Sequence, residues 1–362
     1  MKRLLAGDIG GTKTWLCLAE VAGGRVRVIA RERFPSGDFE RFEAVLARFR
    51  ARWPAPVDAA CFGVAGPVKD GVCRTTNLPW VLDAAVLSRQ LDGAPVALLN
   101  DLEAAAHGIL ALPPDQFIAL NPRARERADA HRAVIAAGTG LGEALLIRSG
   151  DGVTVVATEG GHCDFAPRDA REDALLAWLR RSYPDHVSYE RAVSGPGLAL
   201  LYRFLREREP ARESAQVAAA MATADPAAVV SRGALEWGDP LCLETLRWFA
   251  ALYGAEAGNL ALKSLALGGI YIAGGIAPKI LPVLQQGHFL AGFTAKGRYR
   301  ELLAEVPLQV VLFTEVVLLG ALAWGCRHLL GVGEAAVYNG LRESESLTQG
   351  EADHEENVGR RR

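Results

Sequence analysis

Short apolar runs that stop at glycine or aspartate restrict the fold of this sequence more than any other feature. Five of them are LLAGD from Leu4, CFGVAG from Cys61, VALLND from Val96, AVIAAGTG from Ala133 and IYIAGGI from Ile270. Their length and β-branched content predict buried strands. Helical patterns lie between them, at Phe39 to Arg50, Ala84 to Leu91, Ala170 to Arg181 and Leu241 to Leu262. This alternation predicts an α/β fold, in which ligands gather at the carboxyl ends of the strands.

Two segments of the chain echo each other. LLAGDIGGTKTWLCLAEV from Leu4 and AVIAAGTGLGEALLI from Ala133 both read as strand, glycine turn, strand. Each predicts a β-hairpin that opens a domain. Two such hairpins facing each other across a cleft would direct two sets of turn amides at one polyphosphate. The alternative is two unrelated hairpin turns.

The chain is long for one compact core. It has 362 residues, whereas single cores stop growing near about 250–300 residues. Half of the residues are hydrophobic and 23% are charged, which leaves enough apolar material for a sizeable interior. We therefore expect two domains.

The charge and the start of the chain indicate the kind of partner. The formal net charge is -2, which offers no basic field for a nucleic acid. The opening MKRLLAGDIGG breaks into aspartate and glycine before a signal peptide's apolar stretch can form. No apolar run approaches the roughly 18 residues that span a bilayer. We expect a cytoplasmic protein with a small-molecule partner, no nucleic acid and no membrane.

The cysteines argue against a zinc or redox centre. All six are scattered without a Cys-x-x-Cys pair, at Cys17, Cys61, Cys73, Cys163, Cys242 and Cys326. Zinc sites and thioredoxin-like centres need such closely spaced pairs. These cysteines are expected to be reduced core residues.

The first glycine turn is a candidate phosphate site. It resembles a P-loop, but Thr12 stands where that motif requires its second glycine. In the other interpretation Asp8 ends a strand and orients hydrated magnesium, while the amides of Gly10, Gly11 and Thr12 approach phosphate. A glycine-rich hairpin with a structural aspartate is the alternative.

Two more glycine turns follow apolar strands. Gly138, Thr139 and Gly140 form the second phosphate candidate, with the Thr139 hydroxyl able to meet a phosphate oxygen. Gly274 and Gly275 end the strand IYIA, where a nucleotide base or ribose would lie against bare backbone. A plain strand-to-helix turn is the alternative for this last pair.

Asn100 and Asp101 come directly after the apolar run PVALL. An amide and a carboxylate side by side at a strand end form a ligand-facing position. A positioned carboxylate can accept the proton of a hydroxyl as that oxygen attacks phosphorus. The alternative is that Asp101 caps the helix beginning near Leu102.

Glu159, His162 and Glu190 are candidates for contacting a polyhydroxylated ligand. The Glu-to-His spacing in Thr158-Glu159-Gly160-Gly161-His162 equals that of a helical metal motif, but two central glycines each cost a helix about 1 kcal/mol. In a loop the same two side chains supply hydrogen-bonding groups instead. Glu190, just before a Ser-Gly-Pro-Gly turn, adds a carboxylate or is a solvated helix charge.

Together these segments resemble the bacterial glucokinase family that lacks a structural zinc. The resemblance covers roughly residues 4 to 330, through GDIGGTKT, AGPV, TNLPW, LLND, GTGLG, EGGHCDFAP, ERAVSGPGL, GNLAL, IAGGI and KGR in their usual order. It implies a two-domain actin-like ATPase (ribonuclease H-like) fold with an interdomain cleft. The zinc-containing relatives carry a cysteine-rich loop after the EGGH motif, whereas only Cys163 follows here.

The resemblance also implies roles for individual residues. Asp101 is implied as the general base. Asn77, Asn100, Glu159, His162 and Glu190 are implied as ligands of the sugar hydroxyls. Asp8, Gly10, Gly11 and Thr12, with Gly138, Thr139 and Gly140, would hold the ATP phosphates, and Asp8 would hold Mg²⁺ through water. Gly274 and Gly275 would lie beside the nucleoside.

The family's domain plan divides the chain in three. Residues 1–110 and 301–330 would form a small α/β domain, and residues 111–300 a large one, commonly in a homodimer. Residues 331–362 are too polar to bury much and are expected to be disordered. Glu143 stands at a position that is usually apolar in the family, so its charge either alters nucleotide affinity or faces solvent. At Thr314-Glu315-Val316, before the last helix, many members of the family have a more polar turn.

The expected activity is transfer of the γ-phosphoryl group of ATP to the 6-hydroxyl of glucose. Three alternatives are open: a kinase for another hexose or an amino sugar, a non-catalytic sugar-sensing regulator, and a structural ATP-binding protein that polymerises. The set of sugar-contacting residues weighs against the last.

Overall fold

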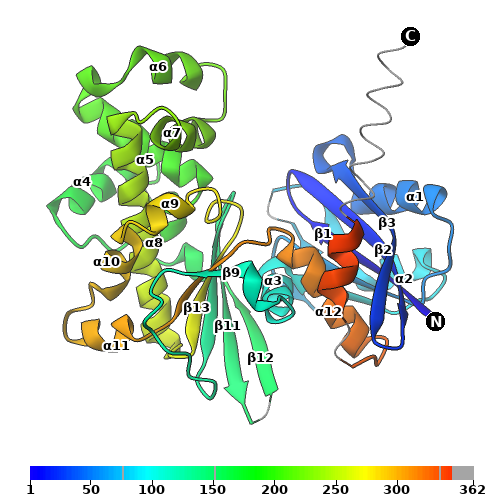
Figure 1. Cartoon of the computed structure of the whole chain (residues 1–362). Helices are drawn as coiled ribbons and strands as arrows, with labels where there is room; N and C mark the ends of the chain where they lie inside the picture. Colours follow the sequence, from blue (N-terminus) through cyan, green and yellow to red (C-terminus); the bar gives the residue numbers. More distant parts are fainter. Residues whose placement is uncertain (76, 151, 334–335, 345–362) are drawn as a thin grey trace. The chain divides into compact units, whose positions relative to one another are not determined.

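The computed structural model describes residues 1–75, 77–150, 152–333 and 336–344. The chain divides into two compact units. The first unit contains residues 1–114 and the C-terminal part from Glu315, and the second unit contains Asp115–Thr314 (Figure 1). The boundaries expected near residues 110 and 300 are thus replaced by 114 and 314. Residues 301–314 join the second unit because the strand Leu308–Val311 pairs in its sheet. The cleft expected between the domains stays a prediction.

The first unit is built on a five-stranded sheet with the order β3-β2-β1-β4-β8. Its strands are β1 (Lys2–Ile9), β2 (Lys13–Ala22), β3 (Arg25–Pro35), β4 (Ala59–Val64) and β8 (Val96–Asn100). β1 is antiparallel to β2 and parallel to β4, which is parallel to β8. A small second sheet contains β5 (Val68–Lys69), β6 (Val72–Arg74) and β7 (Val81–Asp83). The predicted hairpin and three of the predicted strands are confirmed here.

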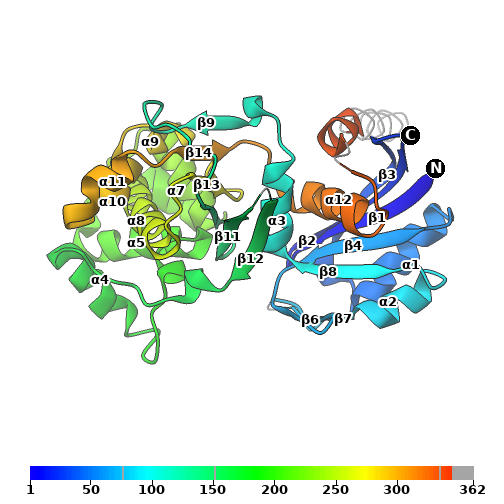
Figure 2. The same cartoon turned by 90° about the horizontal axis from the view of Figure 1, so that it is seen from below.

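Helices cover both faces of this sheet. Figure 2 shows α1 (Phe42–Arg52) and α2 (Ala84–Gln90) on one face, with α3 (Asp101–Leu110) and α12 (Val316–His328) on the other. The short 3₁₀ helices η1 (Ser36–Asp38) and η2 (Pro114–Gln116) join elements of the chain. α3 and α12 approach closely at Gly108 and Gly320. A Cβ atom on Gly320 would lie 1.7 Å from the Ala104 carbonyl oxygen, so only glycine permits this contact.

The second unit repeats the same strand order. Its sheet runs β12-β11-β10-β13-β14-β9. The strands are β9 (Phe117–Ala119), β10 (Arg132–Ala137), β11 (Leu141–Ser149), β12 (Gly152–Thr158), β13 (Gly269–Ala273) and β14 (Leu308–Val311). β10 is antiparallel to β11 and parallel to β13, so the second predicted hairpin is confirmed. Both units therefore place a glycine turn and parallel strand ends at one edge of a sheet.

The helices of the second unit lie on one side of its sheet in both cartoons (Figures 1 and 2). They are α4 (Ala170–Leu179), α5 (Gly195–Arg208), α6 (Ala215–Met221), α7 (Pro226–Leu235), α8 (Pro240–Ser264), α9 (Leu281–Leu284), α10 (His288–Thr294) and α11 (Arg300–Ala304). Short 3₁₀ helices are η3 (Gly160–His162), η4 (Tyr189–Arg191), η5 (Pro210–Arg212) and η6 (Gly297–Tyr299). The helices predicted at Ala170 and Leu241 are confirmed as α4 and α8.

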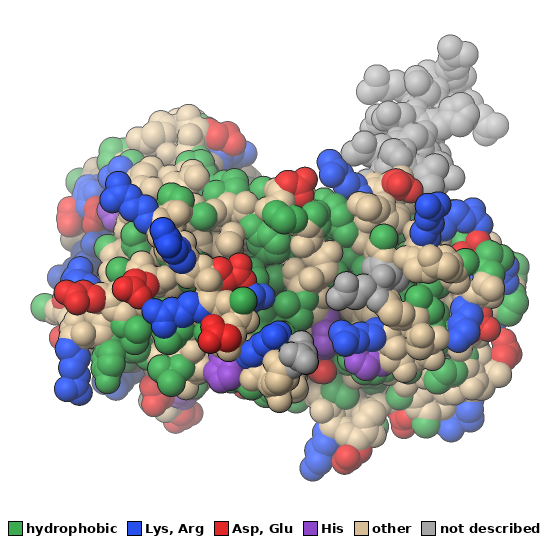
Figure 3. Space-filling view, turned by 60° about the horizontal axis from the view of Figure 1, so that its bottom comes forward, with side chains coloured by type: hydrophobic (Ala, Val, Ile, Leu, Met, Phe, Trp, Pro, Cys, Tyr) green, Lys and Arg blue, Asp and Glu red, His purple; other side chains and the backbone are tan. Residues whose placement is uncertain are grey.

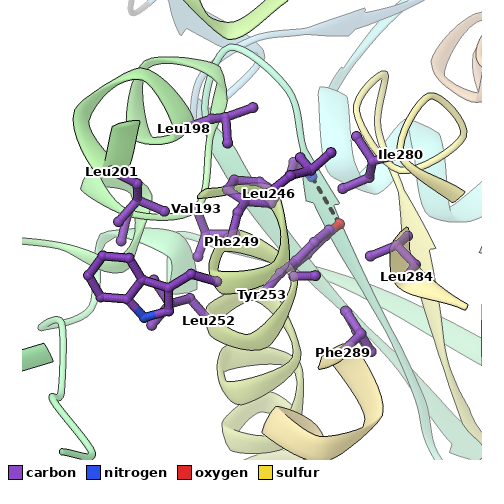
Figure 4. Close-up of a cluster of buried hydrophobic side chains, with 14 of the residues drawn as sticks. Val193, Leu198, Leu201, Leu246, Phe249, Leu252, Tyr253, Ile280, Leu284 and Phe289 are labelled. Carbon is purple, nitrogen blue, oxygen red and sulfur yellow. Dashed lines mark hydrogen bonds between the residues drawn. The ribbon is translucent and has the colours of Figure 1, made fainter. Parts of the chain in front are cut away.

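A tyrosine of the central helix α8 hydrogen-bonds to the sheet. α8 begins where the Asp239 side chain accepts a hydrogen bond from the Cys242 amide at 2.9 Å, and Pro240 occupies the first turn. The Tyr253 hydroxyl accepts from the Ala137 amide at 3.1 Å, as the dashed line in Figure 4 shows. The same hydroxyl donates a hydrogen bond to the Ile135 carbonyl oxygen at 3.1 Å. Buried apolar side chains surround it, so the end of β10 is held by the core.

Part of the predicted tail is ordered, which corrects the expectation for residues 331–362. Residues 337–344 are helical. Ala336 donates from its amide to the Gly24 carbonyl at 3.0 Å, and Val337, Tyr338 and Leu341 are buried. This segment packs on β3 because it presents a few apolar side chains that the polar composition of the tail concealed. Residues 345–362 lie outside the described residues.

Charges are mixed over the surface. On the face drawn in Figure 3, basic and acidic side chains lie next to one another. This mixture agrees with the formal net charge of -2.

We expect Gly108→Ala to destabilise the first unit. A Cβ atom there would lie 2.0 Å from the Val316 carbonyl oxygen, and backbone cannot move as easily as a side chain. Overpacking costs about 1–3 kcal/mol, and a clash with backbone at this distance belongs at the upper end, above the roughly 1 kcal/mol that alanine gains over glycine in a helix. Thermal melting measures the effect. Gly37→Ala, at a position with open space around it, is the control, and equal melting temperatures for the two variants would contradict the packing argument.

Candidate functional site

In the first unit the predicted residues gather at the carboxyl edge of the sheet. The strand register pairs Ile9 with Val64, and Val64 with Asn100. Parallel strands that end together place the residues following them at one edge. Asp8, the turn after Ile9 and Asp101 are thereby brought together. Asp101 lies close enough to Asp8 for its charge to affect the Asp8 carboxyl.

The first glycine turn is held by a serine that the sequence analysis did not identify. Gly10 donates from its amide to the Lys13 carbonyl at 3.1 Å, which closes the turn. The Ser36 hydroxyl donates to the Gly10 carbonyl at 2.7 Å, and the Ser36 amide donates to the Thr12 carbonyl at 3.1 Å. Asn77 lies against the turn, since a Cβ atom on Gly11 would be 2.8 Å from the Asn77 Cβ. No sequence motif marks Ser36, because its partners lie more than 20 residues earlier.

Asp8 has a strongly perturbed carboxyl group. Burial, followed by the negative charge of Asp101, raises the pKa of Asp8 from 3.8 to about 7. Lys13 opposes this shift and Glu315 adds to it. A half-buried carboxyl beside other carboxyl groups favours a bound cation, and oxygen ligands are those that Mg²⁺ prefers. The donor set of this edge therefore fits magnesium.

Asn100, rather than Asp101, caps α3. The Asn100 Oδ1 atom accepts from the amides of Leu102 at 2.9 Å and Glu103 at 3.3 Å. Its Nδ2 atom donates to the Gly66 carbonyl at 3.1 Å, and the side chain is buried. Asp101 is the first residue of the helix, half-buried, with Oδ1 accepting from the Leu102 amide at 2.9 Å. Asn100 thus serves the backbone and uses one of its two amide hydrogens for Gly66.

In the second unit, the turn after β10 meets Glu190. The Gly138 amide donates to the Gly140 carbonyl at 2.9 Å, and the Gly195 amide donates to the Gly138 carbonyl at 2.8 Å. The Glu190 Oε2 atom accepts from the Leu141 amide at 3.0 Å. A side chain on Gly140 would collide with this carboxylate, at 2.6 Å from the Cβ position. The turn residues Gly138, Thr139 and Gly140 are therefore next to Glu190.

Glu159 and His162 flank the 3₁₀ helix η3. The His162 Nε2 atom is 4.0 Å from the Glu190 Oε2 atom, and His162 and Glu159 are exposed. Gly161 lets this loop pack against β11, since a Cβ atom there would be 1.9 Å from the Leu141 carbonyl oxygen. A single 3₁₀ turn does not have the helical geometry that a Glu-x-x-His metal site needs. We call residues 158–163 the η3 loop.

Gly274 and Gly275 lie at the same edge as the second turn. β10 and β13 pair through Ala136 and Ala273, so the residues after both strands are neighbours. Gly274 has φ of 84°, and a Cβ atom on it would lie 2.4 Å from the Ala137 carbonyl oxygen. Only glycine fits this position.

Two further features of the sites were missed from the sequence. Arg31 forms an ion pair with Glu315 and stacks 4.4 Å from the centroid of the Trp15 ring, beside the edge that carries Asp8. Glu143 neither faces solvent nor lines the turn: it is 2% exposed and buried under the η3 loop. Both contacts join residues distant in sequence, so no local pattern signals them.

Comparisons with known proteins identify the family of this chain. A family model described as Glucokinase matches residues 5–328. The glucokinase of Nostoc sp. (strain PCC 7120) is 43% identical over 336 residues, which cover 89% of this chain and 98% of the relative. The crystal structure of glucokinase from an Antarctic psychrotroph has a TM-score of 0.73 at 30% identity, covering 89% of this chain and 98% of that one.

A more distant structure shares the fold. A ROK family glucokinase from Streptomyces griseus, in complex with glucose and AMPPNP, has a TM-score of 0.61 at 20% identity and covers 88% of this chain and 97% of that one. These likenesses confirm the actin-like ATPase fold. Among the residues that the structure describes, none of the helices combines the length and hydrophobicity that a bilayer crossing requires.

We expect Asp8→Asn to stabilise the protein at pH 8 without ligands. The folded-state pKa of Asp8, about 7, lies above the ordinary value of 3.8. The folded state therefore holds a proton that the unfolded state releases, and stability falls as the pH rises from about 4 to about 7. Asparagine removes this loss because it cannot ionise.

Thermal melts of both proteins at pH 4.5 and pH 8 measure the effect. The variant should melt higher than the original protein at pH 8, and the difference should shrink at pH 4.5. Asp38→Asn, at an exposed position of the same unit, is the control. A difference that is the same at both pH values would contradict the assignment to Asp8.

Proposed function

The chain belongs to the glucokinase family, and from this premise we propose how its residues transfer the γ-phosphoryl group of ATP to the 6-hydroxyl of glucose. It is an ATP-dependent hexose kinase. The observation that carries the proposal is the position of Asp101, the first residue of α3, at the carboxyl edge of the sheet beside Asp8. Products are glucose 6-phosphate and ADP.

Asp101 acts as the general base. A sugar hydroxyl is a weak nucleophile at neutral pH, so a carboxylate that accepts its proton lowers the barrier. The 6-oxygen forms a bond to the γ-phosphorus, the bond from that phosphorus to the bridging oxygen breaks, and ADP leaves with the electron pair. The proton passes to an Asp101 oxygen. Positioning and electrostatics supply most of the acceleration in such transfers.

The glycine turns bind the nucleotide. Backbone amides of Gly10, Gly11 and Thr12 in one unit, and of Gly138, Thr139 and Gly140 in the other, hold the phosphates. These turns suit the task because no large side chain obstructs their amides. The Thr139 hydroxyl adds a donor. Gly274 and Gly275 leave room for the nucleoside.

Asp8 would hold magnesium through water. When bound, this ion neutralises charge on the phosphate oxygens. The raised pKa of Asp8, about 7, supports this assignment because a nearby cation relieves the repulsion among the carboxyl groups.

The proposed sugar ligands are polar side chains of each unit. Asn100 keeps one amide hydrogen beyond its bond to Gly66 and donates it to a hydroxyl. Glu190 has a second carboxylate oxygen, Oε1, besides the one on the Leu141 amide. Glu159, His162 and Asn77 complete the set. Each of these groups has the donors or acceptors that hydroxyl groups require.

We also propose that the protein acts in the cytosol as a homodimer, as the family resemblance implies. Light scattering coupled to size-exclusion chromatography gives the mass. Twice the chain mass of 38.7 kDa is expected, and a mass of one chain would reject the dimer.

Incubation with ATP, Mg²⁺ and glucose, followed by mass spectrometry, tests the activity directly. A sugar phosphate that forms only when ATP is present is the expected result. The same assay with other hexoses and amino sugars measures the breadth of acceptors. Glucose should give the highest kcat/KM, and no product from any sugar would reject the kinase.

We expect Asp101→Asn to lower kcat by roughly 10²–10⁴-fold, the usual range for loss of a general base. Glucose affinity should change little, because asparagine keeps the shape and hydrogen-bonding capacity of the side chain. Steady-state kinetics and calorimetric titration with glucose measure the two quantities. Asp92→Asn, an exposed substitution in the same unit at a φ of 57° that asparagine tolerates, is the control. Near-normal turnover in Asp101→Asn would remove Asp101 from this role.

A further inference from the structure

Two buried glutamates lie under the η3 loop. Glu143, on β11, is 2% exposed, and Glu256, on α8, is 0% exposed. Their carboxyl groups lie close enough to hydrogen-bond to each other. Among the described residues, neither Glu143 Oε1 nor Glu256 Oε1 has a hydrogen-bond donor. Two buried carboxylates in contact repel each other, so one proton held between them satisfies the pair.

The surroundings place that proton on Glu143. Asn259 donates to Glu256 Oε2 at 2.8 Å, and the Lys263 ammonium is 3.7 Å from Glu256 Oε1, so Glu256 is the better stabilised anion. Burial and then the charge of Glu256 raise the pKa of Glu143 to about 8, while Lys263 lowers it. Glu143 is therefore the member of the pair that holds the proton.

Glu143 contacts the η3 loop in two ways. Its Oε2 atom lies against the α-carbon of Gly160, 1.9 Å from where a Cβ atom would stand. Its backbone carbonyl accepts from the Thr158 hydroxyl at 3.0 Å, and that hydroxyl accepts from the Gly160 amide at 3.2 Å. Gly160 lies between Glu159 and His162, so residue 143 supports the backbone that carries both side chains.

The same network reaches Glu190. Asn259 donates to the Tyr189 hydroxyl at 3.3 Å, and Lys296 donates to Asn259 at 2.5 Å. Tyr189 directly precedes Glu190 in η4. Every group that the sugar is expected to contact in the second unit is thus attached to elements that rest on this network.

Other charged and titratable groups interact with the pair or with its neighbours. They are Tyr253 and Lys263 from α8, Lys296 from the segment before η6, Tyr189 from η4, and Arg168 with Glu172 at the start of α4. Arg168 and Glu172 neutralise each other as an ion pair. Burial and then Arg168 and Lys263 lower the pKa of Lys296 to about 8, against the opposing effect of Glu256.

We propose that Glu143 is a positioning residue for sugar binding, and that the single proton it shares with Glu256 keeps the η3 loop in its binding conformation. The inference rests on the proposed function for the sugar-contacting role of Glu159 and His162. Loss of the proton places a second negative charge under Gly160. The loop then moves away, and KM for glucose rises while kcat, which depends on Asp101, changes less.

Three variants test this proposal. Glu143→Gln keeps the size and the donor of a neutral carboxyl but cannot ionise. Glu143→Ala removes the support for Gly160. Glu20→Gln, a buried glutamate of β2 in the other unit, is the control and should behave as the original protein.

The first measurement is KM for glucose from pH 7 to pH 9. In the original protein KM should rise about tenfold by pH 9, since a group with a pKa of about 8 is then roughly one-tenth protonated and apparent affinity scales with that fraction. In Glu143→Gln the rise in KM over this range should be much smaller, with any remainder due to Lys296, whose pKa is also about 8. A Glu143→Gln profile that rises as in the original protein would overturn the shared proton.

The second measurement does not depend on catalysis. Cys163, in the η3 loop, is exposed, whereas the other five cysteines are buried. Its rate of reaction with a thiol reagent, compared among variants at one pH, reports on the loop. Glu143→Ala should react several-fold faster and have a raised KM, whereas Glu143→Gln should match the original protein at pH 7. Unchanged labelling and KM in Glu143→Ala would overturn the positioning role.

The two measurements separate this proposal from the proposed function. If no variant phosphorylates glucose, the kinase assignment fails and the labelling rates alone decide whether Glu143 holds the loop. If all variants are active, KM and labelling must change together in Glu143→Ala, or the proposal is wrong.

Discussion

The abrupt junction between β8 and α3 is the constraint on which the proposed site depends. β8 ends at Asn100 and the helix begins at the next residue, so the capping amide of Asn100 fixes where Asp101 can lie. At Gly108 and Gly320 the backbones of α3 and α12 are in direct contact, and this contact holds α3 in place. Local capping and tertiary packing together keep Asp101 beside Asp8. The two carboxyl groups are then near enough to repel each other, and this repulsion raises the pKa of Asp8.

In the second unit, too, local hydrogen bonds and tertiary packing together position the site residues, but other residues provide them. Its strands repeat the order of the first, and Tyr253 fixes the end of β10 to the core before the chain turns at Gly138. The polar groups beneath the η3 loop are buried, which is costly unless they are paired. Glu143, Glu256 and Lys296 therefore form a network in which protonation, as much as packing, sets the conformation of the loop.

Much of the fold was predictable from the sequence because its signals are local. Strand ends marked by glycine and aspartate, the two hairpins and the helix at Leu241 are confirmed. The family that the order of the motifs implied is confirmed by the match to the family model. Contacts between distant segments were not predictable: Ser36 under the first turn, the burial of Glu143, and the close approach of Gly340 to Val26 on β3. Asn100 rather than Asp101 caps α3. The sequence does not show which of the two is the cap, because both follow the apolar run and the side chains of both types cap helices. The roles of the site residues stay predictions.

The most direct test of the central claim is a crystal structure with glucose and a non-hydrolysable ATP analogue bound. With Asp101 as the general base, one of its carboxylate oxygens should lie about 2.5–3.0 Å from the 6-hydroxyl oxygen, and that oxygen should be in line with the γ-phosphorus. A 6-hydroxyl hydrogen-bonded to another side chain, with Asp101 beyond reach, would contradict it.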